Sequence, residues 1–173
     1  MNFANIHKYS FHPYICDRRI KKKNMTNRST TKGSKAIVLY YSHKGKTAAY
    51  AREIAMYLWS KGVSVRLSAV SDTAPEDLEG CDFLISGCWT CGWFVIGQHP
   101  HVRWKDFARQ IQGRVEASRT LLFTTYRIRT GSMLTRMKRA LGITARQQVP
   151  FLKSRSGRLT PEDKATLDRF ISQ

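Results

Sequence analysis

The chain has 173 residues, the length of one ordinary domain, and 42% of them are hydrophobic, enough for a buried core. Its formal net charge is +18, from 30 Lys and Arg against 12 Asp and Glu. No stretch reaches the roughly 18 apolar residues that a membrane span needs, so we expect a soluble protein. Three of the four cysteines fall within eleven residues, which is not the framework of a small secreted domain; a reducing cytoplasm is the expected location.

Residues 1–34 are predicted to form a basic arm outside the folded domain. Residues 1–35 hold nine basic residues and one acid, so +8 of the charge lies there and +10 on the rest of the chain. The segment lacks sustained helical or strand periodicity, and its second half is almost wholly polar. We therefore predict one folded domain over residues 35–173.

Short apolar runs alternate with amphipathic segments from residue 35 onward. A strand is expected over 35–41, "KAIVLYY", a helix over 47–62, "TAAYAREIAMYLWSKG", and a second strand over 63–70, "VSVRLSAV". The helix is predicted to bury one apolar face, formed by Ala48, Ala51, Ile54, Ala55 and Leu58. The second strand is predicted to point alternate residues inward, namely Val63, Val65, Leu67 and Ala69.

The same alternation continues to the end of the chain. Further strands are expected at "DFLISGC" (82–88), "TLLFTTY" (120–126) and, more weakly, "QQVPFLK" (147–153). Helices are expected at "HVRWKDFARQIQG" (101–113), "SMLTRMKRALG" (132–142) and "TPEDKATLDRFIS" (160–172). The last helix should be capped by Thr160, with Pro161 in its first turn.

Strands that alternate with helices predict an α/β fold in which helices cover both faces of a parallel sheet. Five strands in about 140 residues favour a three-layer doubly wound fold with strand order 2-1-3-4-5. In such folds ligands bind at the carboxyl ends of the strands, near the switch between the first and third strands.

The turn "SHKGKT", residues 42–47, joins the first strand to the first helix and has the composition of an anion site. The first N–H groups of a helix have no internal partners, and the helix dipole favours negative charge there. Ser42 and Thr47 add hydroxyl donors, Lys44 and Lys46 add positive charge, and Gly45 lets the backbone approach closely. The Walker and GxGxxG spacings are both absent. The turn therefore predicts a phosphate monoester site.

The stretch "VLYYSHKGKTAAYAREI" resembles the phosphate-loop signature of the flavodoxin family. The signature positions are filled by Val38, Leu39, Tyr40, Ser42, Gly45, Thr47, Ala51 and Ile54. The resemblance covers about residues 35–173 and implies a flavodoxin-like domain that binds flavin mononucleotide (FMN), with residues 42–47 around the phosphate. His43 belongs to this loop, although a histidine alone does not indicate catalysis. Flavodoxins are typically acidic, so this chain would be an unusually basic member.

The family places the flavin ring between the loops that follow the third and fourth strands. After the third strand, "GCWTCGWFVIG", the resemblance implies cofactor contacts from Cys88, Trp89, Thr90, Gly92 and Trp93. Trp89 or Trp93 could stack on the ring, and Gly92 matches the family's loop glycine. The family often has an acid directly after that glycine; Trp93 and Phe94 stand there instead, so the chain departs from the family at a position that tunes the redox potential.

After the fourth strand, "TTYRIRTG" offers Tyr126 as the second ring-stacking aromatic and Thr124 and Thr125 as polar contacts. The alternative is that Trp89, Trp93 and Tyr126 pack helices or a partner surface.

Cys88 and Cys91 form a CxxC motif whose role the sequence leaves open. A zinc site would need a second ligand pair at suitable spacing, and a redox dithiol usually begins a helix. Structural roles are expected, and a disulfide that exchanges electrons with the flavin is the alternative.

The leading interpretation is an electron-transfer flavoprotein that serves redox partner proteins with an acidic docking face. No catalytic residue or metal ligand is then required. The alternative is an FMN-dependent oxidoreductase that acts on a quinone, a porphyrin-type compound or another planar substrate. A nucleic-acid-binding module is a third class, but Lys and Arg scattered over several helices do not favour it.

Overall fold

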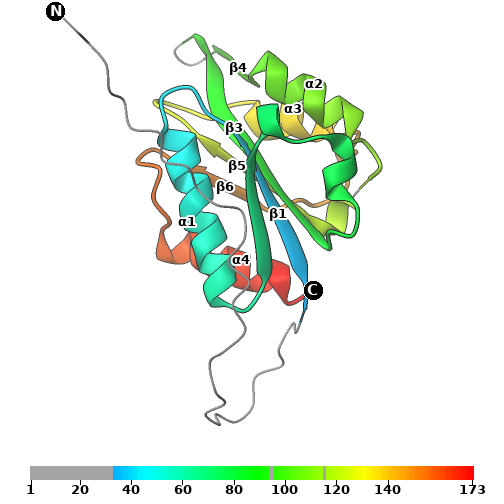
Figure 1. Ribbon diagram of the computed structural model, residues 1–173. Helices are drawn as coiled ribbons and strands as arrows, with labels where there is room; N and C mark the ends of the chain where they lie inside the picture. Colours follow the sequence, from blue (N-terminus) through cyan, green and yellow to red (C-terminus); the bar gives the residue numbers. More distant parts are fainter. Residues whose placement is uncertain (1–32, 94–95, 115) are drawn as a thin grey trace, which may run out of the picture.

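The computed structural model describes residues 33–93, 96–114 and 116–173, so residues 1–32 of the predicted arm lie outside it. The parallel strands are β1 (Lys35–Tyr41), β2 (Ser64–Ala69), β3 (Phe83–Trp93), β5 (Thr120–Thr125) and β6 (Phe151–Ser154). They lie in the order β2-β1-β3-β5-β6 (Figure 1). Counted among the parallel strands alone, β5 and β6 are the fourth and fifth, so this is the predicted order 2-1-3-4-5. The doubly wound α/β class is confirmed.

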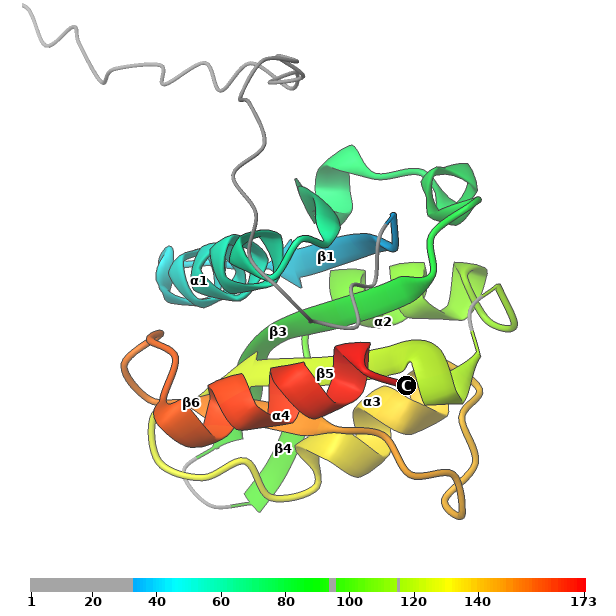
Figure 2. The same cartoon turned by 90° about the horizontal axis from the view of Figure 1, so that it is seen from below.

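Helices cover both faces of the sheet and give the domain three layers (Figure 2). On one face lie α1 (Lys46–Ser60) and α4 (Pro161–Ile171); on the other lie α2 (Val102–Gln110) and α3 (Met133–Ala140). The short 3-10 helices are η1 (Val70–Asp72), η2 (Pro75–Leu78) and η3 (Ala117–Arg119). None of the helices in the described ranges combines the length and apolar character needed to cross a membrane.

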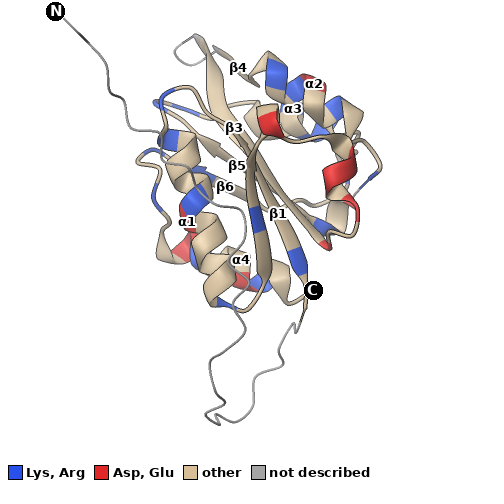
Figure 3. Cartoon of the chain, in the orientation of Figure 1, with Lys and Arg blue, Asp and Glu red and all other residues tan. Residues whose placement is uncertain are grey.

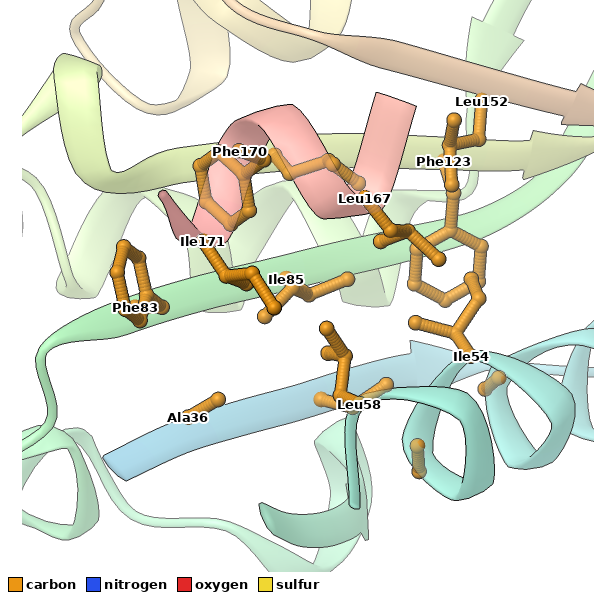
Figure 4. Packing of buried hydrophobic residues seen from close by; sticks show 14 of the residues in the cluster. Ala36, Ile54, Leu58, Phe83, Ile85, Phe123, Leu152, Leu167, Phe170 and Ile171 are labelled. Atoms are coloured by element: carbon orange, nitrogen blue, oxygen red, sulfur yellow. The ribbon is translucent and has the colours of Figure 1, made fainter. Parts of the chain in front are cut away.

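The strand β1 is buried on both sides, as its uninterrupted apolar sequence predicts. Ala36 and Val38 face the core under α1 and α4, and Ile37 and Leu39 face the core under α2 and α3. Figure 4 shows the first core with labels on Ala36, Ile54, Leu58, Phe83, Ile85, Phe123, Leu152, Leu167, Phe170 and Ile171. The predicted face of α1 is confirmed at Ala51, Ile54, Ala55 and Leu58, with Ala48 partly exposed.

The prediction that Leu67 points into the core is wrong. Leu67 is 37% exposed, whereas Val63 is buried and Val65 packs against the core. The cause is the position of β2 at the edge of the sheet, where a neighbouring strand flanks it on one side only.

The segment after the third strand differs from the predicted loop. The strand β3 continues to Trp93 and pairs with a sixth strand, β4 (Ile96–Pro100), which is antiparallel to it. Thr90 pairs with Pro100, and Cys91 pairs with His99. Gly92 has φ 127°, and an added Cβ would lie 3.0 Å from Gly97 O. A glycine at this position therefore permits the hairpin.

The predicted cap of α4 is confirmed and supplies a stability test. The Thr160 hydroxyl accepts a hydrogen bond from the Asp163 N–H at 3.2 Å, and the Asp163 carboxylate accepts one from the Thr160 N–H at 3.0 Å. We expect Thr160→Ala to lower the free energy of unfolding by about 1 kcal/mol in urea denaturation. The control is Thr166→Ala in the same helix, which should change it by less than about 0.5 kcal/mol because alanine favours a helix interior. Equal losses in both variants would contradict the capping role.

Candidate functional site

The parallel register brings the carboxyl ends of three strands to one edge of the sheet. Tyr41 pairs with Cys88, and Cys88 pairs in turn with Thr124. The turn at 42–47, the hairpin of β3 and β4, and the segment at 126–132 that follows β5 therefore begin side by side (Figure 1). The three predicted cofactor segments converge, as the doubly wound topology requires.

The turn at 42–47 leads directly into α1. Gly45 is the N-cap residue and has the left-handed conformation, with φ 79°. A glycine offers no side-chain oxygen to the first N–H groups of the helix, which lack intrahelical partners. His43, Lys44, Gly45 and Lys46 are exposed. The turn thus presents backbone donors and two lysines to an anion.

Thr47 joins this turn to β5. It is 1% exposed, and its Oγ1 lies 2.7 Å from Oγ1 of Thr125, which is also buried. Each hydroxyl can donate one hydrogen bond and accept another, so one hydroxyl of this pair keeps a proton for a further acceptor. This contact holds the start of α1 against the end of β5, where Thr125 is itself a predicted site residue.

Two buried polar atoms at this edge have no hydrogen-bond partner among the described residues: Oγ of Ser42 and Nε1 of Trp89. An unsatisfied buried polar atom costs roughly 1–3 kcal/mol, and such atoms are rare in native structures. An indole N–H can only donate, and a serine hydroxyl can donate. Both atoms therefore fit a ligand rich in acceptor oxygens.

Aromatic rings surround Trp89. Its ring centroid is 6.1 Å from that of His43 and 5.8 Å from that of His101, and His101 stacks on Tyr41 with a centroid distance of 4.4 Å. His101 is the N-cap of α2, where its Nδ1 accepts a hydrogen bond from the Arg103 N–H. Burial, reinforced by the charge of Arg103, lowers the pKa of His101. The neutral imidazole is therefore favoured, as its acceptor role requires.

The threonines at the end of β5 bind within the protein. Thr124 is fully buried; its Oγ1 donates to the Cys88 carbonyl at 2.7 Å and lies 3.0 Å from Oγ1 of Thr90. Thr124 and Thr90 thus link β5 to β3. Tyr126 is half-buried, and its N–H donates to the Ser154 carbonyl at 3.1 Å. Trp93 ends β3, and the predicted contact of its side chain lies outside the described part of the structure.

The CxxC motif does not form a dithiol pair. Three steps along an extended strand separate the two Cα atoms by about 10 Å, beyond the reach of a disulfide. Both cysteines are free and buried. Burial raises the pKa of the Cys88 thiol and raises that of Cys91 to about 11, so neither favours a thiolate. The hypothesis of a disulfide that exchanges electrons with a flavin is therefore wrong for this structure.

In the described part of the chain, no group of three or more His, Cys, Asp or Glu side chains could hold a metal ion.

Basic side chains surround the same edge of the sheet. They come from the turn at 42–47 and from the segments that follow β5 and β6, and all are exposed: Lys44, Lys46, Arg127, Arg129, Arg155 and Arg158. Figure 3 shows Lys and Arg on the loops beside the upper end of α1, and also on other elements of the domain. The site therefore combines buried donors with a positive rim.

Sequence reasoning missed His101 and the turn after β6. The sequence predicts a helix that starts at His101, whereas its place at the site follows from the strand β4, which ends one residue before it. The turn after β6 contacts the segment that follows β5, which lies 28 positions earlier in the chain. Its local sequence, "SRSGR", matches no binding motif.

Comparison with known proteins identifies the fold. No protein-family model matches the chain. Among curated proteins, 92 residues are 26% identical to the mitochondrial pyruvate dehydrogenase [NADP(+)] of Euglena gracilis; they make up 53% of this chain but span only 5% of that protein.

Solved structures match most of the chain. A two-electron reduced flavodoxin of Megasphaera elsdenii aligns with a TM-score of 0.59 at 19% identity, over 80% of this chain and 99% of that chain. The oxidised flavodoxin 2 of Bacillus cereus gives a TM-score of 0.55 at 17% identity, over 80% and 96% of the two chains. Rubredoxin oxygen:oxidoreductase of Desulfovibrio gigas gives 0.56 at 16% identity, over 82% of this chain and 35% of that chain. The chain therefore has the flavodoxin-like fold.

Proposed function

We propose that the chain binds FMN at the carboxyl edge of the sheet and carries electrons between redox partner proteins. The observation that carries this proposal is the pair of unpartnered buried donors, Ser42 Oγ and Trp89 Nε1, where the three segments converge. The flavodoxins with the same fold support the choice of a flavin over another phosphate-containing ligand.

The residues present fit the phosphate of FMN. A phosphate monoester is a dianion with several acceptor oxygens, which matches the Ser42 hydroxyl and the open N–H groups at the start of α1. Lys44 and Lys46 add charge. Thr47, held against Thr125, would keep this end of the site rigid.

The residues present also fit a flat ring. Trp89 lies in β3 and pairs with Thr125 of β5, and the half-buried Tyr126 is the residue that follows Thr125. The fold family holds the flavin ring between the segments that follow these two strands. Aromatic side chains stabilise such a ring by stacking and by apolar burial. The bound flavin would supply the redox chemistry, while His101 and Tyr41 would keep Trp89 in place.

The basic rim supports a redox partner with an acidic face. Opposite charges speed the encounter of two proteins, and this effect weakens as salt is added. The exposed Arg127 and Arg129 lie one and three residues after Tyr126, so they would lie beside the cofactor and at the contact with the partner.

The hairpin supports a second candidate function, an FMN-dependent oxidoreductase for a quinone, a porphyrin-type compound or another planar substrate. The Ser132 hydroxyl donates to the Gln98 carbonyl at 2.8 Å, so β4 is attached to the segment that carries Tyr126. The hairpin of β3 and β4, held in this way, could form one side of a substrate cavity beside the flavin. Rapid oxidation of the reduced protein by a small quinone, with saturation kinetics, would favour this function over that of a carrier.

The cofactor proposal is tested by Ser42→Ala. Because Ser42 Oγ has no hydrogen-bond partner among the described residues, the free energy of unfolding without ligand should stay equal or rise. The affinity for FMN should fall by about 10- to 100-fold, since a charged hydrogen bond is lost, and the affinity for riboflavin should hardly change. Isothermal titration with both ligands measures the difference.

Ser60→Ala, at the exposed end of α1, is the matched control and should leave both affinities unchanged. Equal losses for FMN and riboflavin in Ser42→Ala would contradict the place given to the phosphate.

The positive rim predicts a shifted redox potential. Positive charge stabilises the anionic, fully reduced flavin, so the second one-electron potential should be less negative than in an acidic flavodoxin. Two unit charges at ~4 Å interact by roughly 4 kcal/mol near a protein surface, less when screened, and about 1.4 kcal/mol equals ~59 mV for one electron. The double variant Arg127→Gln with Arg129→Gln should therefore make the potential more negative by on the order of tens of mV in a potentiometric titration. An unchanged potential would refute this electrostatic effect.

A further inference from the structure

The turn that joins β6 to α4, residues 154–158, contacts the candidate site although no sequence motif indicates it. We propose that Arg155 is a positioning residue: its guanidinium holds the segment that follows β5 and so sets where Tyr126 lies. The proposal rests on the proposed flavin function, because Tyr126 matters there as a ring contact.

Arg155 reaches the segment by two hydrogen bonds. Its Nε and Nη2 both donate to the carbonyl oxygen of Arg127, at 3.2 and 3.0 Å. On the other side of Tyr126, the Tyr126 N–H donates to the Ser154 carbonyl at 3.1 Å. The backbone before and after the Tyr126 side chain is thus bonded to two consecutive residues, Ser154 and Arg155.

The turn is itself rigid enough to act as a support. The Ser154 hydroxyl accepts hydrogen bonds from the N–H groups of Gly157, at 2.9 Å, and Arg158, at 3.2 Å, and donates to the Arg158 carbonyl at 3.0 Å. These bonds close the turn around a single buried side chain.

The turn is also fixed against the start of α1. Gly157 has φ 82°, and a Cβ added there would lie 2.8 Å from the Lys46 carbonyl oxygen. One residue beyond the turn, the Leu159 N–H donates to the Glu53 carboxylate at 2.7 Å. The position of the turn is therefore set by its contacts with α1. The bonds from Arg155 in turn fix the backbone beside Tyr126 relative to α1.

The far end of the segment has its own attachment. The Ser132 hydroxyl donates to the Gln98 carbonyl, and Gly131 packs so closely on the Gln98 side chain that a Cβ would meet its Oε1. Between the two attachments, Arg127, Ile128 and Arg129 are exposed. At the near end, the bonds from Arg155 hold the Arg127 carbonyl, where the exposed stretch begins.

Arg158 offers a matched control in the same turn. It carries the same charge, is 81% exposed on its side chain, and forms an ion pair with Glu53 at 3.6 Å. Arg155 and Arg158 thus share their charge and their turn, whereas the two bonds to the Arg127 carbonyl come from Arg155. An effect of positive charge in general would be lost when either arginine is replaced by glutamine. An effect of positioning would be lost only when Arg155 is replaced.

The experiment compares Arg155→Gln, Arg155→Lys and Arg158→Gln with the unaltered protein. Without flavin, amide hydrogen exchange over residues 126–131 should be at least about 5-fold faster in Arg155→Gln, unchanged in Arg158→Gln, and intermediate in Arg155→Lys, whose ammonium can donate one bond to the same carbonyl. Exchange over β1 and β3 serves as the internal reference.

With flavin, Arg155→Gln should weaken the binding of FMN and riboflavin by the same factor, about 3- to 10-fold, and make the bound flavin more fluorescent. In a Tyr126→Ala background the same change should add no further loss, because the two residues act through one contact. Identical exchange and affinities in Arg155→Gln and Arg158→Gln would overturn the proposal. If the unaltered protein binds neither flavin, the proposed function fails, and the exchange comparison alone decides whether Arg155 holds the segment.

Discussion

The parallel pairing of β3 between β1 and β5 is the constraint on which the site depends. It places Tyr41, Cys88 and Thr124 side by side, so the segments that follow these strands must begin at one edge of the sheet. The apolar cores on both faces of β1 hold this register, because a shift by one residue would exchange the two buried faces. Burial in the core thus determines where the donors of the site lie.

The site lowers the stability of the protein without ligand, and the rest of the fold must offset this loss of free energy. Two donors, on Ser42 and Trp89, are buried without a partner in the described structure, and each such atom costs roughly 1–3 kcal/mol. The neighbouring hydroxyls are bonded instead, Thr47 to Thr125 and Thr124 to Cys88. The contrast is the physical argument for a ligand, since the protein satisfies the polar groups that join its strands and leaves open those that face the convergence of its loops.

Much of the fold could be predicted from the sequence because its signals are local. Strand-length apolar runs, helical periodicity and the Thr160 cap predict the elements, and their alternation predicts the strand order. The signal of the turn at 42–47 is also local, since Gly45 and the hydroxyls of Ser42 and Thr47 lie within six residues. The exposure of Leu67 could not be predicted in this way, because alternation along a strand does not show that the strand is at an edge.

The rest of the site depends on contacts between distant parts of the chain. The stretch "GCWTCGWFVIGQHP" has the glycines of a loop, and its pairing as a hairpin follows from the fit of Gly92 against β4. The bonds from Arg155 span 28 positions in the chain, and His101 reaches Trp89 and Tyr41 only because β4 returns beside β3. Such contacts leave no periodic or motif signal.

If FMN binds as proposed, its oxygens accept hydrogen bonds from the unpartnered donors of Ser42 and Trp89. The most direct measurement is the indole N–H resonance of Trp89 in a ¹H–¹⁵N spectrum during titration with FMN, assigned by its loss in Trp89→Phe. We expect a large downfield shift that saturates with the bound flavin, because a free N–H gains an acceptor. Binding of FMN that leaves this resonance in place, or no binding of FMN at all, would contradict it.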